Sequence, residues 1–255
     1  EGLQLGAANL SQDAFVAEIL SGADKRFKGF EVGADVKITP TINAIGVASV
    51  GEYTYQNNPN VYLSADSDRY ARGAESLGRA NIKGFKVAGT PQKAFSLGLK
   101  YNSPKFWWIG ATANYLMDQY LDFSPLNRTS NFYTNPLTGD PYTETSTYPN
   151  YTGTIPEATA ENVAQFLKQT KFGDQFMLNA NGGKSFLLGR YRMGISVSVN
   201  NILNNRNYVT GGYEQGRKSN FREAYIESQR PTPLFGPKLW YDRGRTYFAN
   251  IYFRF

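Results

Sequence analysis

The connections between its alternating stretches constrain the fold of this chain most strongly. Seven stretches show the period of two that a half-buried β-strand requires, namely 27–38, 42–56, 93–102, 105–118, 174–186, 191–203 and 245–255. Very short turns marked by Pro or Gly follow the first, third and fifth stretches, whereas long connections follow the others, over about 57–92, 119–173 and 204–244. Structureless loops of that length are uncommon in compact soluble domains. Transmembrane barrels have this asymmetry by rule, so the sequence predicts an all-β, antiparallel, up-and-down transmembrane β-barrel with long extracellular loops.

The two faces of each predicted strand differ in composition. In the stretch at 191–203, one face carries Met193, Ile195, Val197 and Val199. The other face carries Gly194, Ser196, Ser198 and Asn200. A soluble β-sandwich would alternate in the same way, but its water-facing side is usually rich in Lys, Glu and Thr. Gly, Ser and Asn suit a crowded wet lumen instead, with the apolar face towards lipid. The stretch at 42–56 is small or apolar on both sides, and its sequence alone does not orient it.

Composition agrees with a membrane barrel and excludes several kinds of chemistry. Aromatic residues make up 15% of the chain, yet mean hydropathy is negative, because only alternate residues of such a strand would meet lipid. There is no Cys and no His, which removes disulfides, thiolate metal sites and the commonest general base. The net charge of +6 is scattered along the chain. We therefore expect no catalytic residue, no metal, no cofactor and no nucleic-acid partner.

The strand directions predict which part of a barrel this is. If Phe255 lies at the periplasmic rim, the strands alternate back from it, and residues 1–26 belong to an extracellular loop segment. Bacterial barrels usually have an even strand number and both ends in the periplasm. We therefore expect residues 27–255 to be the C-terminal portion of a larger barrel whose earlier strands lie outside this chain.

Several segments resemble TonB-dependent outer-membrane receptors. "RFKGFEVGADVKITPTINAIGVASVGEYTY" is similar to their late barrel strands, and "GRTYFANIYFRF" is similar to their closing strand. "SVNNILNNRNYVTGGYEQGR" resembles the family's V-x-N-L-F-D-x-x-Y stretch, with Asn204 where Asp is commoner and Tyr208 one residue late. "PQKAFSLGLKYNSPKFWWIGATANYL" is most like members from Bacteroidota. The resemblance covers nearly all of 27–255.

The resemblance implies a barrel of about 22 strands whose lumen is closed by a plug. It implies active uptake of a nutrient, such as a peptide, glycan or siderophore, across the bacterial outer membrane, and no enzymatic activity. TonB would act through the N-terminal part, which this chain lacks. Further implied partners are outer-membrane lipid and lipopolysaccharide, and a surface lipoprotein is another candidate. A passive porin and a structural or secretion-associated barrel are the alternatives.

Three groups of residues are candidates for functional roles. The first is a substrate-facing set in the last long loop, where aromatic and Arg side chains are favoured at binding hot spots: Tyr213, Glu214, Arg217, Arg222 and Trp240. The alternative is that these side chains only pack the loop. The second is an aromatic girdle at the membrane surface: Tyr101, Trp107, Tyr115 and Tyr120. The third is an assembly signal, which the resemblance places in the closing strand: Tyr247, Ile251, Phe253 and Phe255.

Three local motifs lie in or before the loops. The stretch at 159–170 predicts a short helix with Thr159 as its N-cap, and the stretch at 11–20 predicts another. Asp66 and Asp68 have the spacing of some calcium loops, but the further oxygen ligands that such a loop needs are not evident.

Overall fold

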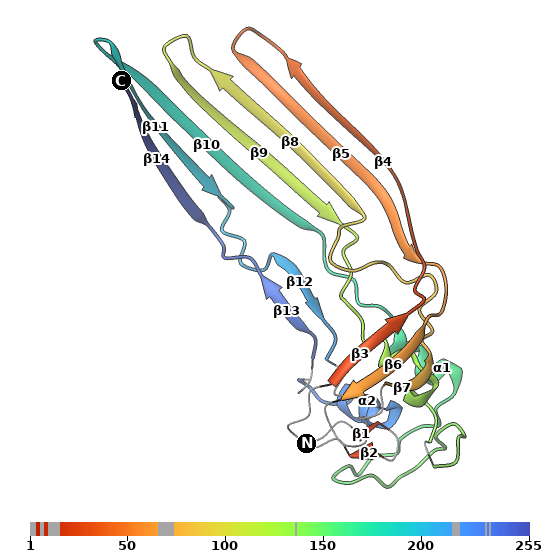
Figure 1. Ribbon diagram of the computed structural model, residues 1–255. Coiled ribbons are helices and arrows are strands. Elements are labelled where there is room, and N and C mark those ends of the chain that lie inside the picture. The colour runs from red at the N-terminus through yellow and green to blue at the C-terminus, as the bar shows by residue number, and fades with distance from the viewer. Residues whose placement is uncertain are drawn as a thin grey trace.

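The long strands form one antiparallel sheet in chain order. The computed structural model describes residues 4–5, 8–9, 16–65, 74–135, 137–215, 220–232, 234 and 236–255. Its seven-stranded sheet has the order β14-β11-β10-β9-β8-β5-β4 (Figure 1). The strands are β4 (Lys25–Lys37), β5 (Ile42–Tyr55), β8 (Lys93–Asn102), β9 (Trp107–Met117), β10 (Gln175–Leu188), β11 (Tyr191–Asn200) and β14 (Thr246–Arg254). All seven predicted strands are confirmed, and the chain is mostly β-strand with few helices.

Short and long connections lie at opposite ends of this sheet. The turns between β4 and β5, β8 and β9, and β10 and β11 gather at one end, which we call the turn end (Figure 1). In the last of these turns Gly189 has φ of 63°, a left-handed conformation that glycine adopts without steric cost. The long connections gather at the other end, which we call the loop end. The predicted asymmetry of the connections is confirmed.

One face of the sheet is apolar across all seven strands. Directly opposed residues form a row from β4 to β10: Val32, Ala48, Phe95, Tyr115 and Phe176. A second row nearer the turn end continues from β5 to β14: Ile42, Tyr101, Ile109, Gly182, Val197 and Ala249. Because side chains alternate along a strand, both rows lie on the same face. We call it the apolar face; its side chains are largely uncovered, with Ile109 56% and Ile251 69% exposed.

The opposite face is polar, and aromatic rings on it pack over glycine residues. Gly194 lies opposite Tyr252, and a Cβ at Gly194 would come within 2.2 Å of that ring. At Gly183 a Cβ would come within 2.9 Å of the indole nitrogen of Trp108. The abundance of glycine on this polar face therefore has a packing cause in addition to the backbone freedom of the residue.

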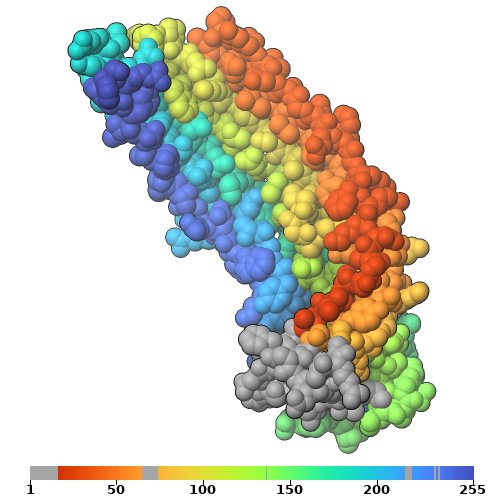
Figure 2. Space-filling model, in the orientation of Figure 1, coloured from red at the N-terminus to blue at the C-terminus, as the bar shows by residue number. Residues whose placement is uncertain are grey.

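The loop end contains smaller sheets and short helices. The strands form three sheets: β1 (Gln4–Leu5) with β2 (Ala8–Asn9), β3 (Val16–Ser21) with β6 (Asn60–Ala65) and β7 (Glu75–Arg79), and β12 (Val209–Tyr213) with β13 (Lys238–Tyr241). The helices are η2 (Leu126–Arg128), η3 (Ser130–Phe132), α1 (Ala160–Leu167) and α2 (Phe221–Ser228). In the space-filling view the long sheet is a curved slab that continues into this thicker end (Figure 2).

The packed core lies in the loop end. Among the described residues there are two clusters of buried apolar side chains, one around Val61, Leu63 and Ile82, the other around Phe132, Ile155 and Phe221. Only Tyr55, at the last position of β5, comes from a long strand. Apart from Tyr55, the apolar side chains of the long strands lie outside the two buried clusters that the described residues form.

The two helix predictions had different outcomes. The helix at 159–170 is confirmed as α1, and the backbone N–H of Asn162 donates to Thr159 Oγ1 at 3.2 Å, as an N-cap requires. The helix at 11–20 is wrong where the structure describes it, because Val16–Ser21 is strand β3 paired with β6. An isolated helix of about ten residues is only marginally stable in water. Pairing with β6 instead places β3 against the buried Val61 and Leu63. Asp66 and Asp68 lie outside the described residues.

The stretch that resembles the family's V-x-N-L-F-D-x-x-Y motif ends β11 in a tight turn. Asn201 is buried, with φ of 52°. Its amide nitrogen donates to the Asn205 carbonyl at 2.9 Å, and its amide oxygen accepts from the Asn205 N–H at 2.9 Å. Asn tolerates the left-handed region better than other residues with side chains, so the turn depends on this residue type.

Within the described residues, none of the helices combines the length and the hydrophobicity that crossing a bilayer requires.

Candidate functional site

A buried ion pair joins two long loops at the loop end. The Arg128 side chain, 1% exposed, binds the Glu214 carboxylate through both terminal nitrogens, with Nη2 donating to Oε1 at 2.8 Å. The backbone N–H of Ser124 also donates to Glu214 Oε2 at 3.2 Å. The guanidinium carbon lies 5.7 Å and 5.8 Å from the ring centroids of Phe85 and Phe123. The pair therefore fixes the loop that follows β9 against the loop that follows β11.

A pocket of about 380 Å³ lies beside this ion pair. Its lining comes from distant segments: Glu18, Leu20, Tyr55, Asp122, Phe123, Ser124, Pro125, Tyr213 and Glu214. Asp122 and Tyr213 are joined by a parallel β-bridge, which brings the two loops to the same wall. Tyr55 ends β5 on its polar face, so the pocket lies where the polar face of the sheet meets the loops.

Burial controls the electrostatics of this pocket. It raises the pKa of Glu18, and the neighbouring Asp122 carboxylate raises it further. Burial also raises the pKa of Asp122, although the Phe123 N–H and the charge of Lys25 act in the opposite direction. The pocket therefore offers two carboxyl groups that hold a proton more readily than carboxyls in water do.

These two carboxyl groups make the stability of the loop end depend on pH. The pKa values of both carboxyl groups are raised in the folded state. Their contribution to folding stability is therefore fully present below the pKa of the unfolded chain, about 4, and is lost as pH rises through the pKa of the folded state. We expect the thermal unfolding midpoint of the full-length protein to fall less between pH 4 and pH 8 in the double variant Glu18→Gln/Asp122→Asn than in the wild type. The variant Asp140→Asn, at an exposed carboxylate, is the control and should follow the wild type. An unchanged pH profile in the double variant would contradict the assignment.

The predicted substrate-facing residues are partly brought together. Tyr213 and Glu214 line the pocket, and the ring of Trp240 lies 6.2 Å from that of Tyr213 across β12 and β13. Arg222 lies elsewhere, on α2, with its guanidinium 4.6 Å from the Tyr142 ring. Arg217 lies outside the described residues. Glu214 is held by Arg128, so its first role is structural, and contact of this set with a substrate stays a prediction.

Glu18, Asp122 and Arg128 were missed at the sequence level. Glu18 lies within the stretch that was predicted to be helical, and Asp122 and Arg128 lie in a loop without periodicity. Arg128 and Glu214 are 86 residues apart, so no local pattern connects them.

The aromatic-girdle residues lie at two levels of the sheet. Tyr101 and Trp107 contact each other at the turn end, with ring centroids 5.1 Å apart. Tyr115 lies near the loop end of the apolar face, where its hydroxyl donates to Asp174 Oδ2 at 3.0 Å. Tyr120 lies beyond the end of β9, in an isolated bridge with Lys171. In the closing strand β14, Tyr247, Ile251 and Phe253 share the apolar face; an assembly role for them and for Phe255 stays a prediction.

Among solved structures, a bacterial siderophore receptor is similar to this chain. No protein-family model matches the sequence, and no curated protein is significantly similar to it. The crystal structure of the siderophore receptor PiuA from Acinetobacter baumannii is similar to this chain with a TM-score of 0.48 and 14% sequence identity. The match covers 91% of this chain and 22% of that receptor, so the chain spans about a fifth of the receptor's length.

Proposed function

We propose that this chain is a portion of an outer-membrane β-barrel that takes up a nutrient in a TonB-dependent manner, as the resemblance of its strands implies. The long sheet would be one sector of the barrel wall, with the polar face towards the lumen and the loop end outside the cell. The substrate would first meet the loop end, where the pocket with Tyr213 and Glu214 lies. No step of this uptake needs a catalytic residue in the chain.

The observation that carries the proposal is the exposed apolar face. Monomeric soluble proteins rarely expose apolar patches of more than a few hundred Å², whereas this face extends over seven strands. The strands contain 9 to 14 residues, and a tilted strand needs about 9–11 to cross a bilayer. Aromatic side chains lie towards both ends of the face, with Phe95 and Tyr115 at the loop end and Trp107 and Phe253 at the turn end, as in the girdles of outer-membrane barrels.

The partners follow from the same placement. Outer-membrane lipid and lipopolysaccharide would surround the apolar face. TonB would act through the part of the protein that precedes this sector, and a surface lipoprotein would contact the loop end. Uptake that stops when the proton gradient is collapsed would support the receptor, whereas a passive porin would keep conducting.

The orientation can be tested by labelling, because this chain contains no Cys and any Cys elsewhere in the full-length protein can be replaced by Ser. Single Cys residues are introduced into the full-length protein at Ser103 and Arg190 in the turns, and at Leu137 and Glu161 in a long loop. We expect an impermeant maleimide to label only the two loop positions in intact cells and all four positions after permeabilisation. Labelling of only the turn positions in intact cells would reverse the orientation, and equal labelling of all four would contradict membrane crossing.

A further inference from the structure

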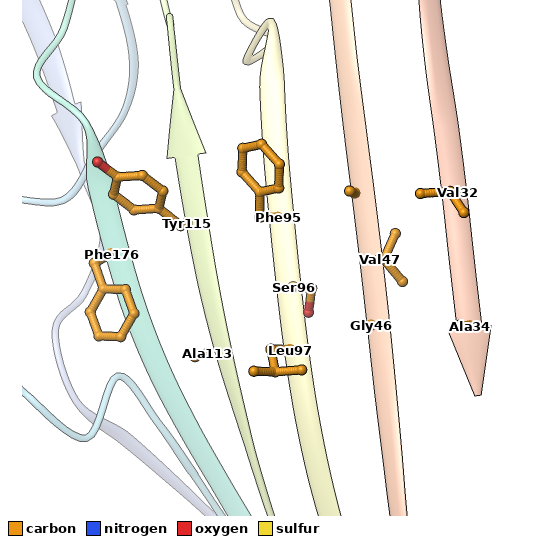
Figure 3. Close-up of a pocket in the computed structure, with 11 residues that line it drawn as sticks. Val32, Ala34, Gly46, Val47, Phe95, Ser96, Leu97, Ala113, Tyr115 and Phe176 are labelled. Atoms are coloured by element: carbon orange, nitrogen blue, oxygen red, sulfur yellow. The ribbon is translucent and has the colours of Figure 1, made fainter. Parts of the chain in front are cut away.

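The apolar face contains a hollow near its loop end. The hollow measures about 400 Å³ and extends from β4 to β10 (Figure 3). Small residues form its floor, namely Ala34, Gly46, Ala48 and Ala113. Larger side chains surround them, with Val32 on one side and Phe95, Tyr115 and Phe176 on the other (Figure 3). The shape results from this distribution of sizes, because the backbone of the sheet is continuous beneath it.

The register places the hollow within two rows of opposed residues. The outer row is the one that runs from Val32 to Phe176. The inner row, one same-face step towards the turn end, contains Ala34, Gly46, Leu97 and Ala113. One such step is two residues, or about 6.6 Å along a strand. The hollow is therefore an elongated apolar depression that opens sideways from the sheet.

Basic side chains border the hollow on its loop side. Lys28 Nζ lies 2.6 Å from Glu52 Oε2, and Lys86 Nζ lies 2.8 Å from Glu52 Oε1. Lys28 is two same-face steps above Val32, so this group lies about 13 Å from the hollow's outer row.

A second group of charges lies above the other side of the hollow. Lys93 is one same-face step above Phe95, and its Nζ lies 2.7 Å from Asp118 Oδ2. Lys171 pairs with the other oxygen of the same carboxylate. The two groups contain four lysines and two carboxylates, Glu52 and Asp118. Asp174 adds a third carboxylate beside Tyr115, so the excess is one positive charge.

We infer that the hollow and its basic border form a lipid-binding site, with an acyl chain in the hollow and the lipid's anionic phosphate group at Lys28 and Lys86. The inference rests on the proposed function, because it requires the apolar face to lie in a membrane. An acyl chain is as apolar as the hollow's lining, so retention would come from close packing in the depression rather than from hydrophobicity alone. A phosphate accepts charge-assisted hydrogen bonds from ammonium groups, and the excess positive charge gives it a counter-charge beside Glu52.

The decisive variant fills the hollow. A Cβ at Gly46 would meet no heavy atom within 4 Å, so Gly46→Leu is accommodated by the sheet and occupies the floor of the hollow. Gly33→Leu is the matched control, because Gly33 lies on the polar face of the neighbouring strand and its Cβ would meet nothing closer than 3.9 Å. The full-length proteins are extracted from vesicles containing phosphatidylglycerol and examined by native mass spectrometry.

We expect wild-type protein and Gly33→Leu to retain one phosphatidylglycerol, and Gly46→Leu to retain at least tenfold less. Equal retention in the two leucine variants would overturn the site. Diacylglycerol, which lacks the phosphate, should be retained at least tenfold less than phosphatidylglycerol by the wild type. The variant Lys28→Gln/Lys86→Gln should lose that preference, while Lys100→Gln, on the polar face, should keep it; equal retention of both lipids by the wild type would refute the role of the phosphate.

The readouts separate this inference from the proposed function. Wild-type protein could be folded in the outer membrane and yet release all lipid on extraction. That result would contradict the lipid site without affecting the proposed function. Absence of the wild-type protein from the outer membrane would overturn both.

Discussion

Replacing Arg128 by Ala is expected to destabilise the loop end by about 3–5 kcal/mol, since breaking a buried ion pair leaves an uncompensated charge. Among the described residues, Glu214 would keep only the Ser124 N–H as a donor. The aromatic contacts of the guanidinium with Phe85 and Phe123 would also be lost. At about 1.4 kcal/mol for each factor of ten, proteolytic cleavage within 119–173 should become at least a hundredfold faster. The measurement is limited proteolysis of the folded full-length protein.

Arg79→Ala is the control for this prediction. Arg79 is exposed on β7 in the same loop end, so its loss should cost less than about 0.5 kcal/mol. The double variant Arg128→Met/Glu214→Leu is expected to recover most of the stability, because an apolar pair of similar volume needs no charge compensation. Equal proteolysis rates in Arg128→Ala and Arg79→Ala would contradict the structural role of the buried pair.

The long strands were predictable because their signal is local. A period of two and short Pro or Gly turns can be read along a single segment, as at 191–203. The strand β5 shows the limit of this approach, since Ile45 and Val47 are as apolar as their neighbours on the other side. Its orientation follows only from its partners, which place Ala48 opposite Phe95 on the apolar face.

The loop end was not predictable in the same way because its contacts are long-range. The strand β3 forms because β6, about 40 residues later, supplies its hydrogen-bonding partner, and that partner is invisible to a helical-period count. The pocket brings together Glu18, Asp122 and Tyr213, which no sequence spacing relates. Glu18 and Asp122 lie in segments without a chemical motif, and the motif that contains Tyr213 gives no sign of either of them, so only the folded loops place the three together.

Introducing Arg at Val197 is expected to cost about 2–4 kcal/mol if the site lies near the bilayer midplane, whereas Arg at Ser198 should cost much less. The two positions are adjacent in β11 and differ in the face they occupy. Val197 lies opposite Ala249 and Gly182 on the apolar face, and Ser198 lies opposite Phe248 and Asn181 on the polar face. A guanidinium at 197 would have to leave water for lipid, while one at 198 would stay in a polar environment.

The comparison is made by urea unfolding of the full-length protein from lipid vesicles. Comparing Arg at 197 with Arg at 198 controls for β-propensity and for net charge, because the same residue is introduced at consecutive positions of one strand. A loss of a few kcal/mol at 197 with a small loss at 198 would place the apolar face in lipid. Equal losses at both positions would mean that the two faces are wrongly assigned or that β11 does not lie in a membrane, and the proposed uptake function would then lose the observation on which it rests.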